Sequence, residues 1–199
     1  SEFFAGDAHK AIPGFVVSAL FRANPYMHYF AQEYGEKGMD KEGFSGRDGR
    51  TTIFDYWSVD TMCRADEGQL TDDEKRLSDT YYKILRFARA DKTVYMGKTY
   101  DLMYVNPHSD SFNPDRQYAF LRRSGRQLLI VVANFDDNER DIELLIPSHA
   151  FEWLKIHTIE AEGYDVLTDE KVKVFFSPDQ KIKMHVPAYG AAIWKFKTV

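Results

Sequence analysis

The sequence contains one cysteine in 199 residues, Cys63, and no long apolar run. A single thiol excludes an internal disulfide framework and any zinc site built on paired cysteines. No apolar stretch approaches the roughly 18 to 20 residues needed to cross a bilayer, so no membrane partner is expected. The first ten residues lack the basic-then-apolar order of a signal peptide, and the compartment stays open between cytoplasm and periplasm.

Excess basic charge is also missing. The formal net charge is -5 and the sequence pI is about 5.7. These values argue against a nucleic-acid partner, because such binders carry a clustered basic face. The one basic cluster, Arg122, Arg123 and Arg126, brackets a Ser124-Gly125 turn and predicts a solvated hairpin tip.

The composition is that of a globular chain. Hydrophobic residues make up 44% and aromatic residues 15% of the sequence. This content is sufficient for one good core or two small ones and is far from that of disordered chains.

The N-terminal part predicts a helix followed by a buried strand. Apolar residues recur at helical spacing from Ala11 to Leu20 behind the N-cap residue Asp7, and the pattern stops at Asn24-Pro25. The nearly continuous apolar run 26–31 then predicts a strand buried on both faces in a parallel sheet. His28 within it is predicted to be a hydrogen-bonded core residue rather than a metal ligand, since the six histidines show no ligand spacing.

A long loop and a second helix follow. Five glycines between residues 35 and 49 predict an ordered loop that leads to an aromatic stretch at 53–57. Thr71 and Glu74 have capping-box spacing and predict the start of a helix with one apolar face.

After Asp91 the hydrophobic period changes from 3.6 to 2, which predicts an all-β domain. Lysines alternate with aliphatic residues, as in 171–174, and this pattern indicates antiparallel strands with one solvated face. The predicted strands are Leu102 to Val105, Gln117 to Arg123, Gln127 to Phe135, Asp141 to Ile146, Lys171 to Phe176, Lys181 to Val186 and Ala191 to Phe196.

One buried parallel strand between two helices cannot be stable alone, because it needs a neighbouring strand on each side. Such an ending remains when an α/β barrel is cut after its seventh strand. We therefore expect an α+β chain of two parts. Residues 1–92 form the terminal helix-strand-helix piece of a (β/α)8 barrel, and residues 93–199 form an antiparallel Greek-key β-sandwich.

Several segments resemble glycoside hydrolase family 13, the alpha-amylase family. Residues 11–35 are similar to that family's seventh helix and eighth strand, where Gln32-Glu33 match a Gly-Gln-Glu motif and Ala31 replaces the glycine. Residues 49–57 resemble the loop after the eighth strand, and the helix from Thr71 resembles the eighth barrel helix. Residues 128–135, 165–172 and 185–196 resemble the C-terminal domain in the family's order.

The resemblance implies that the chain is the C-terminal part of a retaining alpha-glucan-active hydrolase. The three catalytic carboxylates of that family would precede Ser1, so no catalytic residue is expected in this chain and the chain alone should be inactive. An acid pair drawn from Glu33, Glu36, Asp48 and Asp55 is an alternative on spacing alone.

The resemblance also implies a set of non-catalytic site residues. Gln32 and Glu33 would be structural residues at the strand end. The predicted rim of the glucan cleft contains Arg47, Asp48, Arg50, Tyr56 and Trp57. The charged members could instead form a loop-ordering ion-pair network, which their charge pattern favours, and the aromatic members could pack against the barrel. No metal site and no cofactor are expected.

Two other functions remain open. A non-catalytic carbohydrate-binding module would need a row of exposed aromatics, and Trp153 and Trp194 are far apart and embedded in apolar runs. A split enzyme would bind a second chain of barrel size. The resemblance implies an alpha-glucan or maltooligosaccharide as the partner, bound through the parent enzyme, and we expect self-association or the missing barrel portion to cover the open barrel edge.

Overall fold

The computed structural model describes residues 6–36 and 59–197, which form two compact units. The first unit is Ser1–Ala11 with Tyr26–Tyr82, and the second is Ile12–Pro25 with Lys83–Val199. The second unit is called the β-domain below. This division differs from the predicted domains 1–92 and 93–199, because Ile12–Pro25 packs with the β-domain. The assignment of 1–92 to a barrel therefore stays a prediction.

The described part of the first unit is helical. Its elements are η1 (Ala8–Ala11), η2 (Gln32–Tyr34), α3 (Asp60–Asp66) and the first part of α4 (Asp72–Ala90). Asp7 begins η1 as predicted, because its carboxylate accepts a hydrogen bond from the His9 backbone amide at 2.8 Å.

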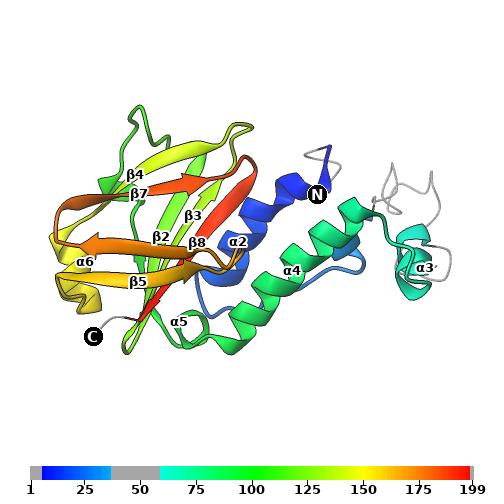
Figure 1. Ribbon diagram of the computed structural model, residues 1–199, viewed down its shortest axis with the longest axis horizontal. Coiled ribbons are helices and arrows are strands. Elements are labelled where there is room, and N and C mark those ends of the chain that lie inside the picture. Colours follow the sequence, from blue (N-terminus) through cyan, green and yellow to red (C-terminus); the bar gives the residue numbers. More distant parts are fainter. Residues whose placement is uncertain (1–5, 37–58, 198–199) are drawn as a thin grey trace. The chain divides into compact units, whose positions relative to one another are not determined.

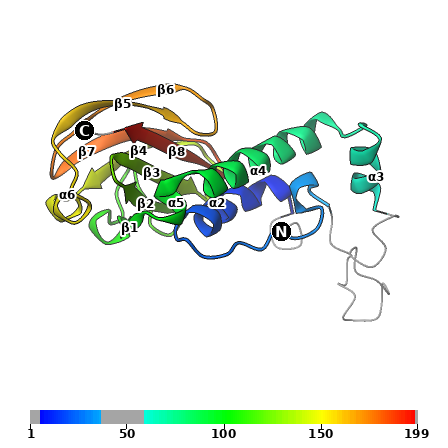
Figure 2. The same cartoon turned by 90° about the horizontal axis from the view of Figure 1, so that it is seen from below.

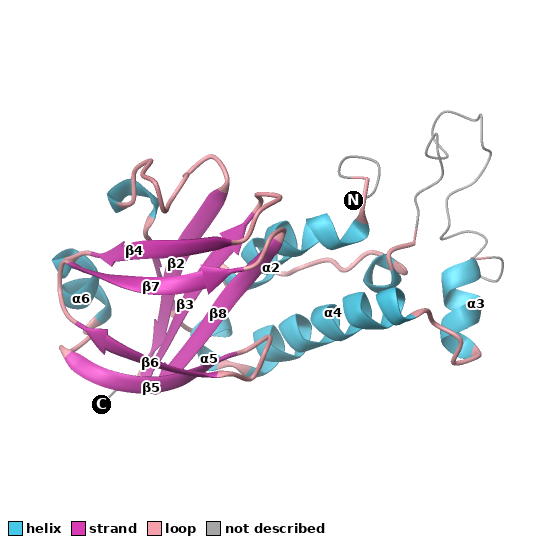
Figure 3. Ribbon diagram, turned by 45° about the horizontal axis from the view of Figure 1, so that its top comes forward, coloured by secondary structure: helices cyan, strands magenta, loops and turns pink. Residues whose placement is uncertain are grey.

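The β-domain contains all the strands of the described residues, drawn in magenta in Figure 3. A six-stranded sheet has the order β1-β2-β3-β8-β5-β6, and β4 pairs only with β7 (Figure 1). Every pairing is antiparallel. The strands are β1 (Lys98–Asp101), β2 (Gln117–Ser124), β3 (Gln127–Asn134), β4 (Arg140–Ile146), β5 (Ile159–Asp165), β6 (Lys171–Phe176), β7 (Gln180–Val186) and β8 (Gly190–Lys197).

Strand β3 is apolar throughout because both of its faces are covered. Leu128, Ile130 and Val132 belong to the core that β4 and β7 also line. The alternate residues Leu129 and Val131 are equally buried but lie outside that core. Helices α2 (Ile12–Leu20) and α5 (Lys92–Tyr95) contact β3, and Figure 2 shows them beside the sheet. The continuous apolar run thus reflects burial on two faces.

The all-β domain is confirmed, and six of the seven predicted strands are present within a residue or so of their expected ends. Leu102–Val105 is wrong: Met103–Val105 is the 3-10 helix η4. The Asp101 carboxylate accepts from the Met103 amide at 2.8 Å, which turns the chain immediately after β1. Greek-key connectivity stays a prediction.

The strand predicted over residues 26–31 is not formed in the described structure, and its place in a barrel stays a prediction. These residues form no ladder, and Met27 and Tyr29 are 85% and 49% exposed. A strand requires a neighbour to pair its backbone groups, and the described residues of the first unit contain no other strand.

Strand β5 and helix α6 (Ser148–Leu154) were not expected from the sequence. Glycine and glutamates give β5 weak strand propensity. Gly163 is required there by packing, because a Cβ at this position would lie 2.3 Å from the Lys195 carbonyl oxygen and 2.6 Å from the Phe196 ring. The close approach of β8 therefore explains why this strand contains a glycine at position 163.

The three arginines were predicted to be solvated, and this prediction is wrong for the first of them, Arg122. Arg122 is 1% exposed, and its guanidinium donates to four backbone carbonyls. The accepting oxygens belong to Leu20, Phe21, Val94 and Gly97. Arg126 alone lies at the exposed tip, so Arg122 is part of the interior that ties α2 and α5 to β2.

Candidate functional site

The predicted strand-end residues lie in a tight turn of the first unit. Ala31 has φ 57° and Gly35 has φ 71°, so left-handed residues stand on both sides of η2. A Cβ at Gly35 would come within 3.1 Å of Ala8 and 3.2 Å of Leu77. The departure from the Gly-Gln-Glu motif therefore occurs at Ala31, a position whose backbone favours glycine.

Gln32 and Glu33 make local hydrogen bonds. Gln32 accepts from the Tyr29 amide at 3.3 Å and donates to the Tyr81 hydroxyl at 3.0 Å. Glu33 lies 2.7 Å from His28 Nε2. His28 is thus hydrogen-bonded, as the sequence predicts, although it is only half-buried. These contacts agree with a structural role for both residues, which stays a prediction.

The Tyr81 phenol gives this turn a pH-dependent contribution to stability. Burial raises the pKa of Tyr81 to about 12, although the hydrogen bond from Gln32 acts in the opposite direction. Because the pKa of Tyr81 is higher in the folded state, the stabilisation by its neutral phenol is fully present below the unfolded-state pKa of about 10. This stabilisation is lost as pH rises toward 12. A pKa difference of two units between the folded and unfolded states corresponds to roughly 3 kcal/mol of folding free energy.

We therefore expect Tyr81→Phe to be about 1 kcal/mol less stable than the wild type at pH 8, through loss of the Gln32 hydrogen bond. The difference should vanish or reverse near pH 11.5. Urea unfolding of both proteins at the two pH values measures it, and a difference that is the same at both values contradicts the assignment.

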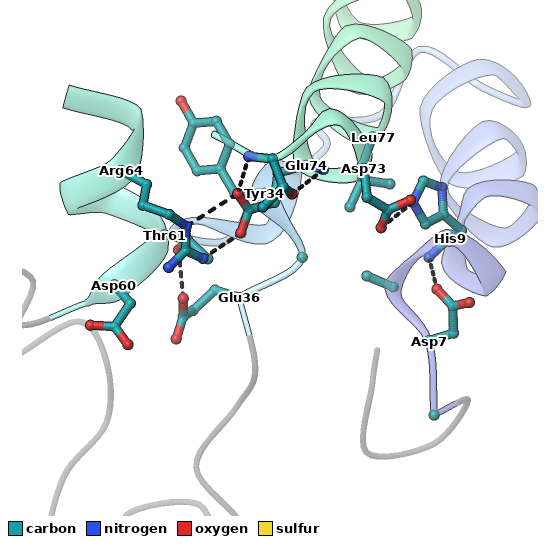
Figure 4. A pocket seen from close by; sticks show the side chains of 14 residues that line it. Asp7, His9, Tyr34, Glu36, Asp60, Thr61, Arg64, Asp73, Glu74 and Leu77 are labelled. Carbon is teal, nitrogen blue, oxygen red and sulfur yellow. Dashed lines mark hydrogen bonds and ion pairs between the residues drawn. The ribbon is translucent and has the colours of Figure 1, made fainter. Parts of the chain in front are cut away.

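A hollow of about 500 Å³ lies in the first unit between η1, η2, α3 and the start of α4 (Figure 4). Five carboxylates and two basic side chains line it. Its acidic and basic residues are Asp7, His9, Glu36, Asp60, Arg64, Asp73 and Glu74. Most of them are paired: His9 contacts Asp73 at 3.2 Å, and Thr61 donates to Glu36.

Arg64 and Glu74 form the best-connected pair in this hollow. Both Arg64 Nε, at 3.2 Å, and Nη2 donate to the two carboxylate oxygens of Glu74. The Glu74 carboxylate also accepts from the Thr71 amide at 2.8 Å, and the Thr71 hydroxyl accepts from the Glu74 amide at 3.2 Å. The capping box predicted from the sequence is therefore confirmed, with Arg64 as an added partner.

Replacing Thr71 by alanine should lower the free energy of unfolding by about 1 kcal/mol, because the Glu74 amide loses its acceptor. Thr80→Ala is the matched control. Thr80 lies inside the same helix and donates only to the Arg76 carbonyl, so alanine there should be neutral or slightly stabilising. Equal losses in the two variants, compared by urea unfolding, would count against the cap.

Asp73 and Glu74, two of the five carboxylates of the hollow, do not suit general-acid chemistry. The hydrogen bond from Arg64 holds the pKa of Glu74 below its ordinary value, and the one with His9 does the same for Asp73. A catalytic acid needs a carboxyl whose pKa is raised. Among the described residues, moreover, no group of three or more histidine, cysteine, aspartate or glutamate side chains could hold a metal ion.

The five predicted rim residues, Arg47, Asp48, Arg50, Tyr56 and Trp57, all lie outside the described residues, as do two of the four alternative acids, Asp48 and Asp55. Of the other two, Glu33 pairs with His28 and Glu36 accepts from Thr61. The sequence did not indicate His9 or Arg64, because their partners lie 64 and 10 positions away with no motif linking them. No helix in the described ranges is long and apolar enough to cross a membrane.

The β-domain matches a known family. Residues 109–197 match the family model described as alpha amylase, C-terminal all-beta domain. No curated protein matches the chain.

The fold is similar to that of several solved structures. AmyP in complex with maltose is 13% identical, with a TM-score of 0.61 over 96% of this chain and 34% of that one. The alpha-amylase of Geobacillus thermoleovorans complexed with acarbose is 13% identical, with a TM-score of 0.56 over 95% of this chain and 33% of that one. The gamma-CGTase of alkalophilic Bacillus clarkii is 14% identical, with a TM-score of 0.55 over 95% and 23%. The chain spans about a third or less of the length of these structures.

Proposed function

We propose that the chain is the C-terminal part of a retaining, alpha-glucan-active glycoside hydrolase, because residues 109–197 match the family model of the alpha-amylase C-terminal all-beta domain. In the longer protein, residues 26–31 supply the last strand of the catalytic barrel, α4 supplies its last helix, and the β-domain shields the barrel. The chain alone does not hydrolyse glucans.

The observation that carries this proposal is the family match of the β-domain. The state of residues 26–31 supports it. Aromatic and apolar side chains dominate this run, yet it is exposed at Met27 and Tyr29 and forms no ladder. A strand meant for a parallel sheet has this composition and remains unpaired until neighbours flank it on both sides.

The substrate class is inferred from the similar structures. AmyP was solved with maltose and with maltotriose, and it covers 96% of this chain. We propose a maltooligosaccharide or longer alpha-glucan as the substrate of the longer protein, with the rim residues Arg47, Asp48, Arg50, Tyr56 and Trp57 beside it. No cofactor or metal is part of the proposal.

The proposed absence of activity in the chain alone is supported by two carboxylates of the hollow in the first unit. A retaining glycosidase needs a nucleophile and an acid with raised pKa roughly 5 Å apart. In the hollow of the first unit the pKa values of Asp73 and Glu74 are shifted downward. We therefore assign the catalytic carboxylates to the remainder of the longer protein.

The test is an assay of the 199-residue chain with maltoheptaose, measuring released reducing ends. We expect no hydrolysis above the buffer rate. Hydrolysis by the chain that disappears in Glu33→Gln or Glu36→Gln would instead support an acid pair within this chain and overturn the assignment.

A further inference from the structure

A row of four aromatic rings lies on the β-domain beside β1, the edge strand of the six-stranded sheet. The ring centre of Tyr100 lies 6.2 Å from that of Tyr104 and 5.7 Å from that of His149. His149 and Trp153 are four residues apart on α6, so they share one face of that helix. Tyr104, Tyr100, His149 and Trp153 are called the aromatic row.

Lys98 contacts the ring at one end of this row, that of Trp153. Lys98 and Tyr100 are two residues apart on β1 and therefore point to the same side of the sheet. The Lys98 ammonium lies 4.8 Å from the centre of the Trp153 ring, while the Tyr100 ring contacts His149. Strand β1 and helix α6 thus meet through two contacts, one between Lys98 and Trp153 and one between Tyr100 and His149.

The outer rings of the row are open to solvent. Tyr104 is 67% exposed and Trp153 is 51% exposed, and His149 is also exposed. The expectation that Trp153 is embedded in an apolar run is therefore wrong, although Trp194 does pack against the core. Tyr100 itself is buried in the core, so the surface consists of three exposed side chains grouped around it. Exposed large aromatic side chains that gather in this way indicate a binding surface.

These rings are held in place before any ligand arrives. The Tyr100 hydroxyl is hydrogen-bonded to the Tyr104 hydroxyl and lies 3.0 Å from His149 Nδ1. Lys98 fixes Trp153 through a cation-π contact. A surface whose side chains are already ordered loses less entropy when it binds.

The chemistry of the row selects a neutral ligand with an apolar face and a hydroxyl-rich edge. Tyr104 and Trp153 offer large apolar ring surface, and the His149 and tyrosine polar atoms offer hydrogen bonds beside it. The four residues of the row include no acidic side chain. In the described structure Lys98 is the one cation that contacts them. A polyanion would require a basic cluster.

We propose that the aromatic row is a non-catalytic binding site for an alpha-glucan chain, whose pyranose rings stack on Trp153 and Tyr104. The choice of an alpha-glucan among neutral saccharides rests on the proposed function. The row lies in the β-domain and uses none of the residues assigned above to the rim of the cleft.

Calorimetric titration of the 199-residue chain with maltoheptaose tests this site. The variants are Trp153→Ala and Tyr104→Ala, and the control is Phe175→Ala, an aromatic residue 61% exposed on β6. We expect each row variant to weaken the association constant by about tenfold or more, since each removes one stacking platform, and the control to stay within about twofold. Circular dichroism checks that each variant is folded, and Tyr104→Ala serves alone if Trp153→Ala is not.

Absence of binding by the wild type up to about 10 mM maltoheptaose overturns the site, as does equal binding by the wild type and both row variants. Binding of cellohexaose as strong as that of maltoheptaose overturns the alpha-glucan assignment. Either failure leaves the proposed hydrolase function standing, because hydrolysis by the longer protein is measured separately. Binding through the row by a longer protein without hydrolytic activity overturns the hydrolase and leaves the row.

Discussion

Replacing Arg122 by methionine is expected to lower the free energy of unfolding of the β-domain by about 3–5 kcal/mol. The reason is the set of carbonyls that this side chain serves. Its guanidinium donates to the oxygens of Leu20 at 3.2 Å, Phe21 at 2.6 Å and Gly97 at 2.9 Å, and to that of Val94. Each acceptor left unsatisfied inside a protein costs about 1–3 kcal/mol, less what rearrangement and water recover.

An opposing effect makes this prediction informative. Burial lowers the pKa of Arg122, and within the described residues no carboxylate forms an ion pair with it. Replacing a buried charge by an apolar side chain of similar size is sometimes neutral. We expect the loss of the hydrogen bonds to outweigh the gain from removing a buried charge. Four acceptors from α2, α5 and their flanking turns would remain without a donor.

Thermal unfolding provides the measurement for Arg122→Met. At about 2–4 °C per kcal/mol for a chain of this size, the Tm should fall by roughly 10 °C. Arg126→Met, at the exposed tip of the same hairpin, should change stability by less than about 0.5 kcal/mol. A shift for Arg122→Met no larger than that of Arg126→Met would mean that the buried guanidinium contributes nothing net.

Replacing Lys195 by methionine is expected to cost about 3–5 kcal/mol at pH 7, because it leaves the Asp91 carboxylate charged and poorly solvated. The side chains of Lys195 and Asp91 are only 7% and 15% exposed, and they are in direct contact. Lys195 also donates to Gln127 at 3.1 Å and lies 5.5 Å from the centre of the Phe87 ring.

The pKa directions explain which partner carries the stabilisation. Burial opposes the charge on both groups. For Asp91, hydrogen bonds from Lys195 and from the Thr93 amide and hydroxyl outweigh burial, and its pKa lies below the ordinary value. For Lys195 burial is the larger effect, and its pKa is lowered despite the contact with Asp91. The pair therefore stabilises the fold mainly through the carboxylate.

The pH dependence of this effect follows from the sign of the Asp91 shift. Because the folded-state pKa of Asp91 is depressed, its contribution is present above the unfolded value of about 4 and is lost as pH falls through the lower folded value. The stability difference between the wild type and Lys195→Met should therefore shrink as pH falls from 5 toward 2.

A double-mutant cycle with Asp91→Asn and Lys195→Met separates the pair from its surroundings, and the double variant should lose less than the sum of the single ones. The control is Lys173→Met, whose partner Glu160 is 3.0 Å away with both side chains more than half exposed. It should cost less than about 1 kcal/mol. Additive losses at Asp91 and Lys195 would contradict the coupling.

The sequence predicted those strands whose side chains alternate regularly. Lys171–Phe176 alternates exposed and more buried residues, and the structure places a strand there with the same ends. Strand β5 was not predicted because its glutamates and Gly163 have low strand propensity. Its position in the sheet depends on close contact with β8, which the sequence does not show. Residues 26–31 were predicted as a strand from their apolar run and from the family resemblance, but a ladder needs partners that the described residues of the first unit do not contain.

Arg122 could not be assigned correctly from the sequence for a similar reason. Arginine beside a turn is usually solvated, and its burial here depends on carbonyls as far as 102 positions away. The aromatic row could not be predicted for the same reason, since Tyr100 and His149 are 49 positions apart and meet only where α6 contacts β1. The capping box at Thr71 was predictable because its two residues are three positions apart.

The central claim, that this chain is part of a retaining alpha-glucan hydrolase, is tested most directly by proton NMR of the longer protein acting on maltoheptaose. The first-formed products should have the α-anomeric configuration of the substrate. Release of β-anomers, or no cleavage of the glucan by the longer protein, would contradict it.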